Sequence, residues 1–132
     1  VPEAGINLAP SLVGERNLRE LHFYPFEAVV KRANIYSLMP GYHEVDGVPV
    51  HASRWLLTDV LRKEWGFAGY VFSDYGAIGM LNNFHKTAHD KAESALQAII
   101  AGVDLEAPGR YAYGELEGLV NSGKLSQAVI DT

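Results

Sequence analysis

The sequence contains no cysteine, and it also lacks several other features that would identify a class of protein. Without cysteine the chain cannot form disulfides, thiolate metal sites or a cysteine nucleophile. No apolar run approaches the roughly 18 residues that a membrane-spanning helix requires. A Gly-rich phosphate loop and a G-x-S-x-G elbow are absent too, so neither phosphoryl transfer nor serine hydrolysis has a motif to support it.

A basic excess is missing as well. The formal net charge is -5, from 11 Lys and Arg against 16 Asp and Glu, which predicts no binding to nucleic acid and no binding to an anionic membrane. A mildly acidic protein can still bind neutral substrates such as sugars. The 132 residues are 48% hydrophobic and 20% charged, which predicts one globular domain with its own core.

The first four residues, Val1–Ala4, include neither an initiator methionine nor the charged-then-apolar pattern of a signal peptide. We therefore expect the chain to be cut from a longer one or processed. The compartment is left open, and a periplasmic or secreted location is favoured over a cytoplasmic one.

Several segments have the apolar spacing that is typical of helices. They are 15–33, 53–66, 90–102, 113–120 and 126–130. Pro25 interrupts the first and is expected to kink it or to begin a second helix. Ser53 is an expected N-cap, and Asp90 with Glu93 resembles a capping box.

Three short strands are expected between these helices, at Ile35–Met39, Tyr70–Ser73 and Val103–Leu105. Residues 1–14 and 42–52 are expected loops, the second with its turn at Asp46 and Gly47. Alternation of helices and strands predicts parallel strands with covering helices, hence an α/β fold. A complete (β/α)₈ barrel needs eight strands and about 250 residues, so this chain can supply only a partial barrel.

Asp74 is the strongest candidate for a catalytic residue. It directly follows an expected strand and precedes a turn, and active sites of parallel α/β folds form at the carboxyl ends of strands. A carboxylate there can attack an electrophilic carbon. The alternative is that Asp74 only caps the following helix.

Other polar residues near strand ends are weaker candidates. Met39 and Tyr42 lie at the end of the first expected strand and form one wall of the same mouth, or else serve only packing. Asp104 and Glu106 flank the end of the third strand and face the mouth, or else belong to a solvated loop.

Two groups of residues have side chains that can bind metals. They are His43, Glu44, Asp46 and His51 in one loop, and His85, His89 and Asp90 further along. Neither has the H-E-x-x-H arrangement or a third ligand at a recognised spacing. We expect surface histidines and no metal site.

Seven runs of residues, in a fixed order, resemble glycoside hydrolase family 3. They are 14–20 (GERNLRE), 37–42 (SLMPGY), 46–49 (DGVP), 55–62 (WLLTDVLR), 64–67 (EWGF), 69–75 (GYVFSDY) and 101–106 (AGVDLE). The resemblance covers nearly the whole chain. It implies that residues 1–132 are the C-terminal part of the family's N-terminal (β/α)₈ barrel domain, which is incomplete here.

The resemblance also implies a chemistry. Asp74 is then the nucleophile of a retaining β-glycosidase, and Met39, Tyr42 and Tyr75 line the subsite for the terminal sugar. No cofactor or metal is implied, and water is the second substrate. The family's Lys-His pair would precede Val1, and the acid/base would come from a later domain or loop. Tyr75 stands where a tryptophan is common, and His43 where many relatives have asparagine.

Three hypotheses follow. The first is an exo-acting β-glucosidase, with β-xylosidase next, that hydrolyses terminal non-reducing β-linked glucose from a β-glucoside or oligosaccharide. The second is a non-catalytic part-barrel that associates with the rest of the barrel or with itself as a homo-oligomer. The third is a sugar-binding module that keeps Met39, Tyr42 and Tyr75 but has no hydrolytic activity.

Overall fold

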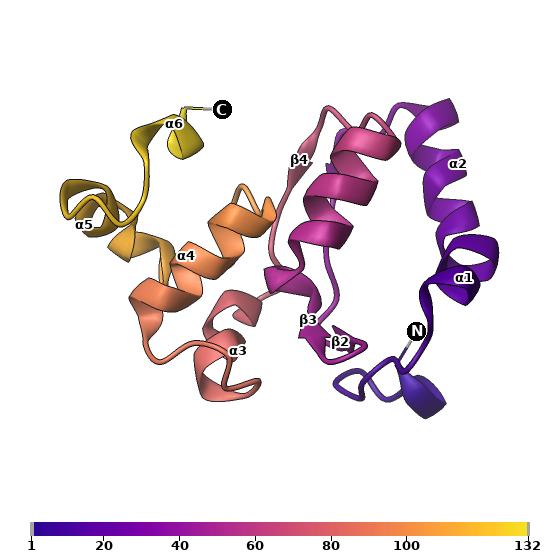
Figure 1. Cartoon of the computed structure of the whole chain (residues 1–132), viewed down its shortest axis with the longest axis horizontal. Helices are drawn as coiled ribbons and strands as arrows, with labels where there is room; N and C mark the ends of the chain where they lie inside the picture. Colours follow the sequence, from indigo (N-terminus) through magenta and orange to yellow (C-terminus); the bar gives the residue numbers. More distant parts are fainter. Residues whose placement is uncertain (1, 132) are drawn as a thin grey trace.

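The computed structural model describes residues 2–131. Val1 and Thr132, the two ends of the segment expected to form a barrel piece, lie outside the described residues. Figure 1 shows α2 at one end of the molecule and α5 and α6 at the other, with β4 between them. In chain order the elements are η1 (Glu3–Gly5), α1 (Glu15–Asn17), η2 (Leu18–His22), α2 (Phe23–Ala33), β1 (Ser37–Leu38), β2 (Glu44–Val45), β3 (Val48–Pro49), η3 (Val50–Ala52), η4 (Trp55–Glu64), β4 (Tyr70–Val71), α3 (Ala77–Asn83), α4 (Lys91–Ala101), η5 (Tyr113–Glu115), α5 (Leu116–Asn121) and α6 (Gln127–Ile130).

The expected N-terminal helix forms as three consecutive pieces, α1, η2 and α2. The N–H of Phe23 bonds the carbonyl of Leu18, five residues back, so the turn before α2 is π-helical. Pro25 is the third residue of α2, where its missing N–H costs little. The backbone is helical at His22 and Phe23, so η2 passes into α2 without a break and no separate helix begins at Pro25.

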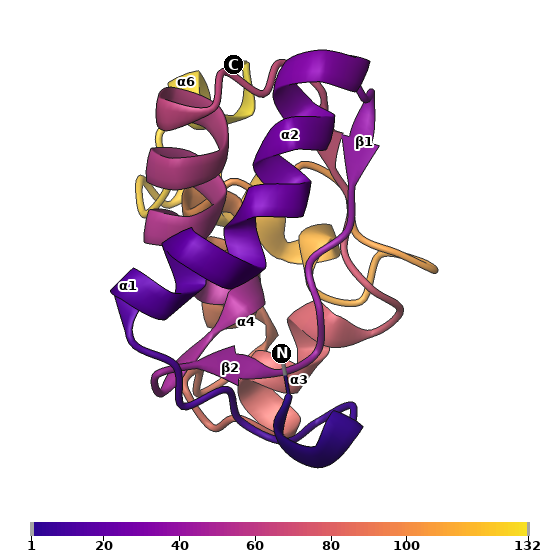
Figure 2. The same ribbon diagram turned by 90° about the vertical axis from the view of Figure 1, so that its right-hand side faces the viewer.

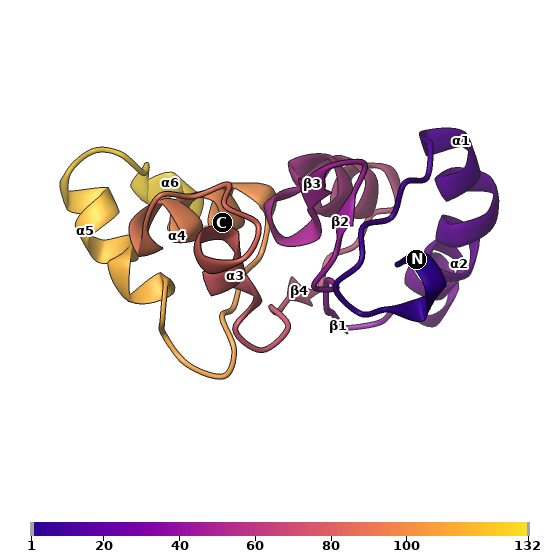
Figure 3. The same ribbon diagram turned by 90° about the horizontal axis from the view of Figure 1, so that it is seen from below.

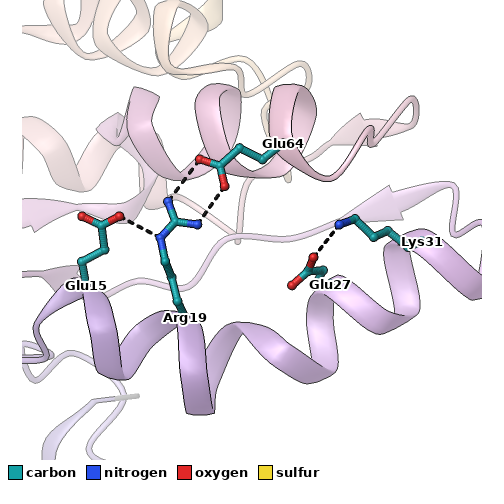
Figure 4. Close-up of polar contacts among 5 residues, drawn as sticks. All are labelled: Glu15, Arg19, Glu27, Lys31 and Glu64. Carbon is teal, nitrogen blue, oxygen red and sulfur yellow. Dashed lines mark hydrogen bonds and ion pairs between the residues drawn. The ribbon is translucent and has the colours of Figure 1, made fainter.

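Arg19 joins this N-terminal helix to the end of η4, as Figure 4 shows. Its guanidinium donates to both carboxylate oxygens of Glu64, at 2.8 and 3.1 Å, and to Glu15 at 2.7 Å. These hydrogen bonds raise the pKa of Arg19 above its usual range. The pairs are partly exposed, so each contributes at most about 1 kcal/mol. Their effect is to fix the spacing between two helices.

The strands are parallel, as expected, but shorter. β1 and β4 pair with Ser37 opposite Tyr70 and Leu38 opposite Val71. The expected third strand is reduced to one parallel bridge, between Phe72 and Leu105. Figure 2 shows the chain returning from α2 into β1, and Figure 3 shows β1 beside β4. Within the described residues β1 has a strand neighbour on one side only, which limits the ladder that can form.

The loop expected over 42–52 contains a hairpin instead. β2 and β3 pair antiparallel, with Val45 opposite Val48. Asp46 and Gly47 form the expected turn, and both have a positive φ, of 48° and 79°. A two-residue turn with this backbone matches the twist of the flanking strands, which explains why a hairpin forms here.

The hydrophobic core lies on one face of β4. The side chain of Val71 is fully buried among residues of η4, α3 and α4, whereas its neighbour Tyr70 is 50% exposed. Alternate residues of a strand point to opposite faces, so helices cover one face and leave the other uncovered. This is what a parallel strand pair with covering helices predicts for part of a barrel.

The expected helix caps are confirmed. The N–H of Leu56 donates to Ser53 Oγ at 3.3 Å, and the N–H of Glu93 donates to Asp90 Oδ1 at 2.8 Å. The Glu93 carboxylate in turn accepts from the N–H of His89 at 2.7 Å. Over residues 2–131, the structure has no helix with the length and apolar character needed to span a membrane.

Candidate active site

Asp74 lies just beyond the carboxyl end of β4, half-buried. Its position is fixed by the preceding residue, Ser73, which is fully buried. The N–H of Ser73 donates to the carbonyl of Leu105 at 2.8 Å, and its Oγ accepts from the N–H of Ala107 at 2.9 Å. Asp74 is therefore held where two neighbouring parallel segments end, which is the edge where parallel α/β folds place their sites.

The alternative that Asp74 only caps the next helix is wrong. α3 has Gly76 as its N-cap, with no side-chain cap. The N–H of Ala77 bonds the backbone carbonyl of Asp74 at 3.1 Å, not its carboxylate. The carboxylate Oδ1 accepts from the N–H of Tyr75 at 2.7 Å instead. The Asp74 side chain therefore lies at the strand end and does not cap the helix.

Tyr42 and Tyr75 lie beside Asp74, as the sequence predicted. The Tyr42 hydroxyl donates to the backbone carbonyl of Tyr75 at 2.9 Å. A hydrogen-bonding interaction with the Asp74 carboxylate, more than desolvation, raises the pKa of Tyr42. Tyr42 is therefore a neutral hydroxyl at neutral pH. The Tyr75 side chain is 67% exposed, so its ring is free to contact a ligand.

Met39 directly follows β1, whose last residue, Leu38, pairs with Val71 of β4, three residues before Asp74. It is 48% exposed and lines an apolar groove of about 460 Å³ between the N-terminal helix, β1 and η4. Asp74 is not among the lining residues of that groove. The roles of Asp74, Met39, Tyr42 and Tyr75 in binding and catalysis stay predictions.

His51 was expected at the surface, and this was wrong. It lies in η3 with 2% of its surface exposed, and its Nε2 accepts from the N–H of Asp74 at 3.1 Å. Burial lowers the pKa of His51 to about 4, against the opposing effects of the Asp74 charge and a hydrogen bond with the Gly41 backbone. An accepting Nε2 assigns the proton to Nδ1.

His85 is buried too, so the surface expectation fails for it as well. Its side chain is 5% exposed, with Nε2 2.9 Å from the carbonyl of Tyr42 and Nδ1 3.7 Å from Glu44. His43 is half-buried, and burial lowers its pKa. His89 is exposed, as expected. Among residues 2–131 there is no group of three or more side chains placed to hold a metal ion.

Asp104 and Glu106 do not lie free in a solvated loop, and that they face the mouth stays a prediction. Asp104 Oδ2 accepts from the N–H of Val71 at 2.6 Å and from Arg62 at 2.5 Å. Glu106 accepts from the N–H of Ala112 and, at 2.8 Å, from that of Tyr113. Both carboxylates therefore hold the backbone together, and none of their described hydrogen bonds reaches Asp74.

The two buried histidines are the residues that sequence reasoning missed. Each contacts a backbone atom of a predicted site residue that is far away in the chain, 23 positions for His51 and Asp74 and 43 for His85 and Tyr42. One local signal pointed to burial, namely the apolar neighbours of His51, Val50 and Ala52. Nothing local pointed to Asp74 as its partner.

A family model described as the glycosyl hydrolase family 3 N terminal domain matches residues 2–132. A β-xylosidase of Formosa agariphila is 45% identical over 102 residues, which are 77% of this chain and 14% of that protein. A periplasmic β-glucosidase of Salmonella typhimurium is 41% identical over 95 residues, 72% of this chain and 12% of that protein. The chain thus spans a small fraction of the length of these relatives.

A solved structure of a β-glucosidase from Listeria innocua superimposes with a TM-score of 0.91 at 35% identity. The match covers 98% of this chain and 18% of the Listeria chain. This similarity confirms the expected α/β fold of a partial barrel, with parallel strands and covering helices.

Proposed function

We propose, from the premise that this chain belongs to glycoside hydrolase family 3, that it contributes the nucleophile Asp74 to a retaining, exo-acting β-glycosidase. The observation that supports this most is the placement of Asp74. Its carboxylate lies at the carboxyl end of the parallel strands, accepts from the N–H of Tyr75 at 2.7 Å and interacts with the Tyr42 hydroxyl. The N–H of Tyr75 holds this carboxylate in one orientation, which nucleophilic attack requires.

The proposed reaction has two steps. In the first, a carboxylate oxygen of Asp74 forms a bond to the anomeric carbon, and the glycosidic C–O bond breaks. The leaving oxygen takes a proton from an acid on another segment. In the second, water attacks the same carbon, the bond to Asp74 breaks, and the proton of the water goes to that acid/base group. The two carboxyl groups of retaining enzymes lie roughly 5–5.5 Å apart, so the second group must come close to Asp74.

The proposed substrate is a β-glucoside or oligosaccharide with a terminal non-reducing β-linked glucose. Similarity to β-glucosidases of known structure supports glucose, and similarity to a β-xylosidase makes xylose the second candidate. Met39, Tyr42 and the exposed ring of Tyr75 are the proposed contacts to the terminal sugar. A periplasmic location is proposed by analogy with the Salmonella relative.

The chain is further proposed to be the C-terminal part of a barrel domain that other segments complete. Two observations support this. The chain matches 18% of the length of the Listeria enzyme, and one face of β4 is uncovered at Tyr70. None of the described hydrogen bonds or ion pairs joins a second carboxylate to Asp74. By itself the chain is therefore proposed to be a non-catalytic part-barrel, and the complete enzyme to be active.

The test uses the Listeria innocua β-glucosidase with this chain in place of its matching segment, here called the grafted enzyme. Hydrolysis of an aryl β-glucoside and an aryl β-xyloside is measured for it and for Asp74→Ala. We expect turnover of the glucoside to fall by at least about 10³-fold in the variant. A 2-fluoro glycoside, which forms a long-lived covalent adduct, should label the peptide that contains Asp74.

The matched control is His89→Gln, because the hydrogen bonds of His89 to Glu93 and Asn82 use only its backbone atoms. It should leave turnover unchanged. Full turnover in Asp74→Ala, or labelling of another peptide, would show that Asp74 is not the nucleophile. A preference for the xyloside would replace glucose by xylose as the substrate.

A further inference from the structure

The backbone N–H of Asp74 has an unusual partner for its position. Along β4, the N–H groups of Tyr70 and Phe72 donate to the carbonyls of Tyr36 and Leu38, at 3.0 and 3.1 Å. In a parallel ladder the next N–H on the same side, that of Asp74, would bond the carbonyl two residues further along the first strand. It bonds His51 Nε2 at 3.1 Å instead.

The imidazole of His51 therefore takes the place of the next strand carbonyl. β1 ends at Leu38, and residues 39–41 of that segment belong to no strand, so the ladder does not continue. An unpaired N–H at this point would be destabilising, because water is excluded and could not satisfy it. A neutral histidine supplies the acceptor, and its ring is 2% exposed and cannot exchange this partner for water.

The same ring also contacts the other side of the site. Because Nε2 accepts from Asp74, Nδ1 carries the proton, and the Gly41 backbone, directly before Tyr42, interacts with the ring. His51 thus bridges the segment that carries Tyr42 and the segment that carries Asp74. The titratable groups that face it are Asp74, His43 and His85.

We propose that His51 is a positioning residue for the nucleophile. Its Nε2 holds the backbone of Asp74 where the strand ladder ends, so that the carboxylate keeps one orientation towards the sugar. This inference rests on the proposed function of Asp74 and goes further, because it assigns a role to a buried residue that contacts no substrate.

Two variants of similar size separate the two contacts of His51. In His51→Gln the side-chain oxygen reaches the position of Nε2 and can accept from Asp74, but the donor to Gly41 is lost. In His51→Asn the shorter amide can donate towards Gly41, but it leaves the N–H of Asp74 without an acceptor. His51→Leu removes both contacts and keeps the site filled.

Turnover of the aryl β-glucoside, the rate of labelling by the 2-fluoro glycoside at saturation, and the thermal midpoint are measured for each variant in the grafted enzyme. We expect kcat and the saturated labelling rate to fall about 10–100-fold in His51→Asn and His51→Leu, with KM changed little. His51→Gln should recover most of the rate. His89→Gln should match the unaltered enzyme.

Several results would overturn the proposal. Equal rates for His51→Asn and His51→Gln would do so, as would a change confined to KM, or a loss of rate that follows the thermal midpoint alone. If His51→Leu fails to fold, the comparison of His51→Asn with His51→Gln still tests the proposal. Turnover that survives in Asp74→Ala would defeat the proposed function itself. Loss of turnover in Asp74→Ala, together with equal rates for His51→Asn and His51→Gln, would contradict only the role of His51.

Discussion

Asp74 owes its position to neighbours that hold backbone rather than side-chain atoms. His51 accepts from the N–H of Asp74, and the carbonyl of Asp74 accepts from the N–H of Ala77. The preceding residue, Ser73, donates its own N–H to the carbonyl of Leu105. Across the site, His85 lies against the carbonyl of Tyr42. The ring of His51 is buried, and burial makes its charged form unfavourable.

A first prediction concerns the pH dependence of stability. Burial lowers the pKa of His51 from 6.5 to about 4 in the folded protein. Between these two values the unfolded chain binds more protons than the folded one, so the free energy of unfolding falls as pH falls from 6.5 to 4. The contribution of neutral His51 to the free energy of unfolding is fully present above pH 6.5. Roughly 3 kcal/mol of it is lost as the pH falls through the folded pKa. Urea unfolding of the grafted enzyme at several pH values measures it.

His51→Gln provides the comparison, because glutamine does not titrate. Its free energy of unfolding should vary less between pH 6.5 and 4 than that of the unaltered protein. His43, whose pKa burial also lowers, contributes with the same sign and stays in both. Identical pH profiles for the two proteins would mean that His51 is not held neutral by burial.

At the scale of elements, the pairing of β1 with β4 depends on a close backbone approach. A Cβ added at Gly69 would meet the carbonyl oxygen of Tyr36 at 2.2 Å, and that carbonyl accepts the first ladder hydrogen bond from Tyr70. We therefore predict that Gly69→Ala lowers the free energy of unfolding by about 1–3 kcal/mol. Chemical denaturation measures the change.

Gly118→Ala is the matched control, since Gly118 lies in α5 and nothing stands within 4 Å of an added Cβ. There alanine should stabilise the protein by about 0.5–1 kcal/mol, because it restricts the unfolded chain and favours helix. Equal effects of the two substitutions would argue against a tight strand contact at Gly69.

The start of α4 gives a second prediction at this scale. Asp90 accepts from the N–H of Glu93 at 2.8 Å, and this cap satisfies one of the free donors of the helix. Asp90→Ala should cost about 1 kcal/mol, and Asp90→Ser should recover most of it. Thermal unfolding checks both. Glu117→Ala, at an exposed position of α5, should change stability by no more than about 0.5 kcal/mol.

At the scale of the whole molecule, the chain exposes surface that a finished barrel would cover. Its apolar groove is bordered by Leu21 and Phe26 of the N-terminal helix, both well exposed, and Tyr70 is exposed on the strand face. Exposed apolar side chains gathered along a groove are a candidate surface for association. The rest of the barrel is the proposed occupant, because the chain matches 18% of the Listeria enzyme.

This arrangement predicts that the isolated chain associates with itself. Light scattering over a range of concentrations should show species larger than a monomer, and Leu21→Asn combined with Phe26→Asn should shift them towards monomer. Glu117→Ala serves as the control and should leave the distribution unchanged. A chain that stays monomeric at every concentration would contradict the view that the groove is an unsatisfied contact surface.

The sequence by itself determined the features that depend on neighbours one to four positions apart. The caps at Ser53 and Asp90, the turn at Asp46 and Gly47 and the helical segments follow from local spacing and backbone preference. The position of Asp74 after a strand was also readable, because a short apolar run followed by a turn marks a strand end.

Only the tertiary structure decided which distant groups meet. The acceptor for Asp74 comes from His51, 23 residues earlier, and the partner of Asp104 is Arg62, 42 residues earlier. The expected strands shortened because a ladder needs a neighbouring strand, and no local preference supplies one. A polar residue such as His51 or Asp104 is chemically the same whether it lies in an exposed loop or in a functional site, so the sequence does not reveal its role. What such a residue does depends on which backbone donors and acceptors the folded chain leaves without partners.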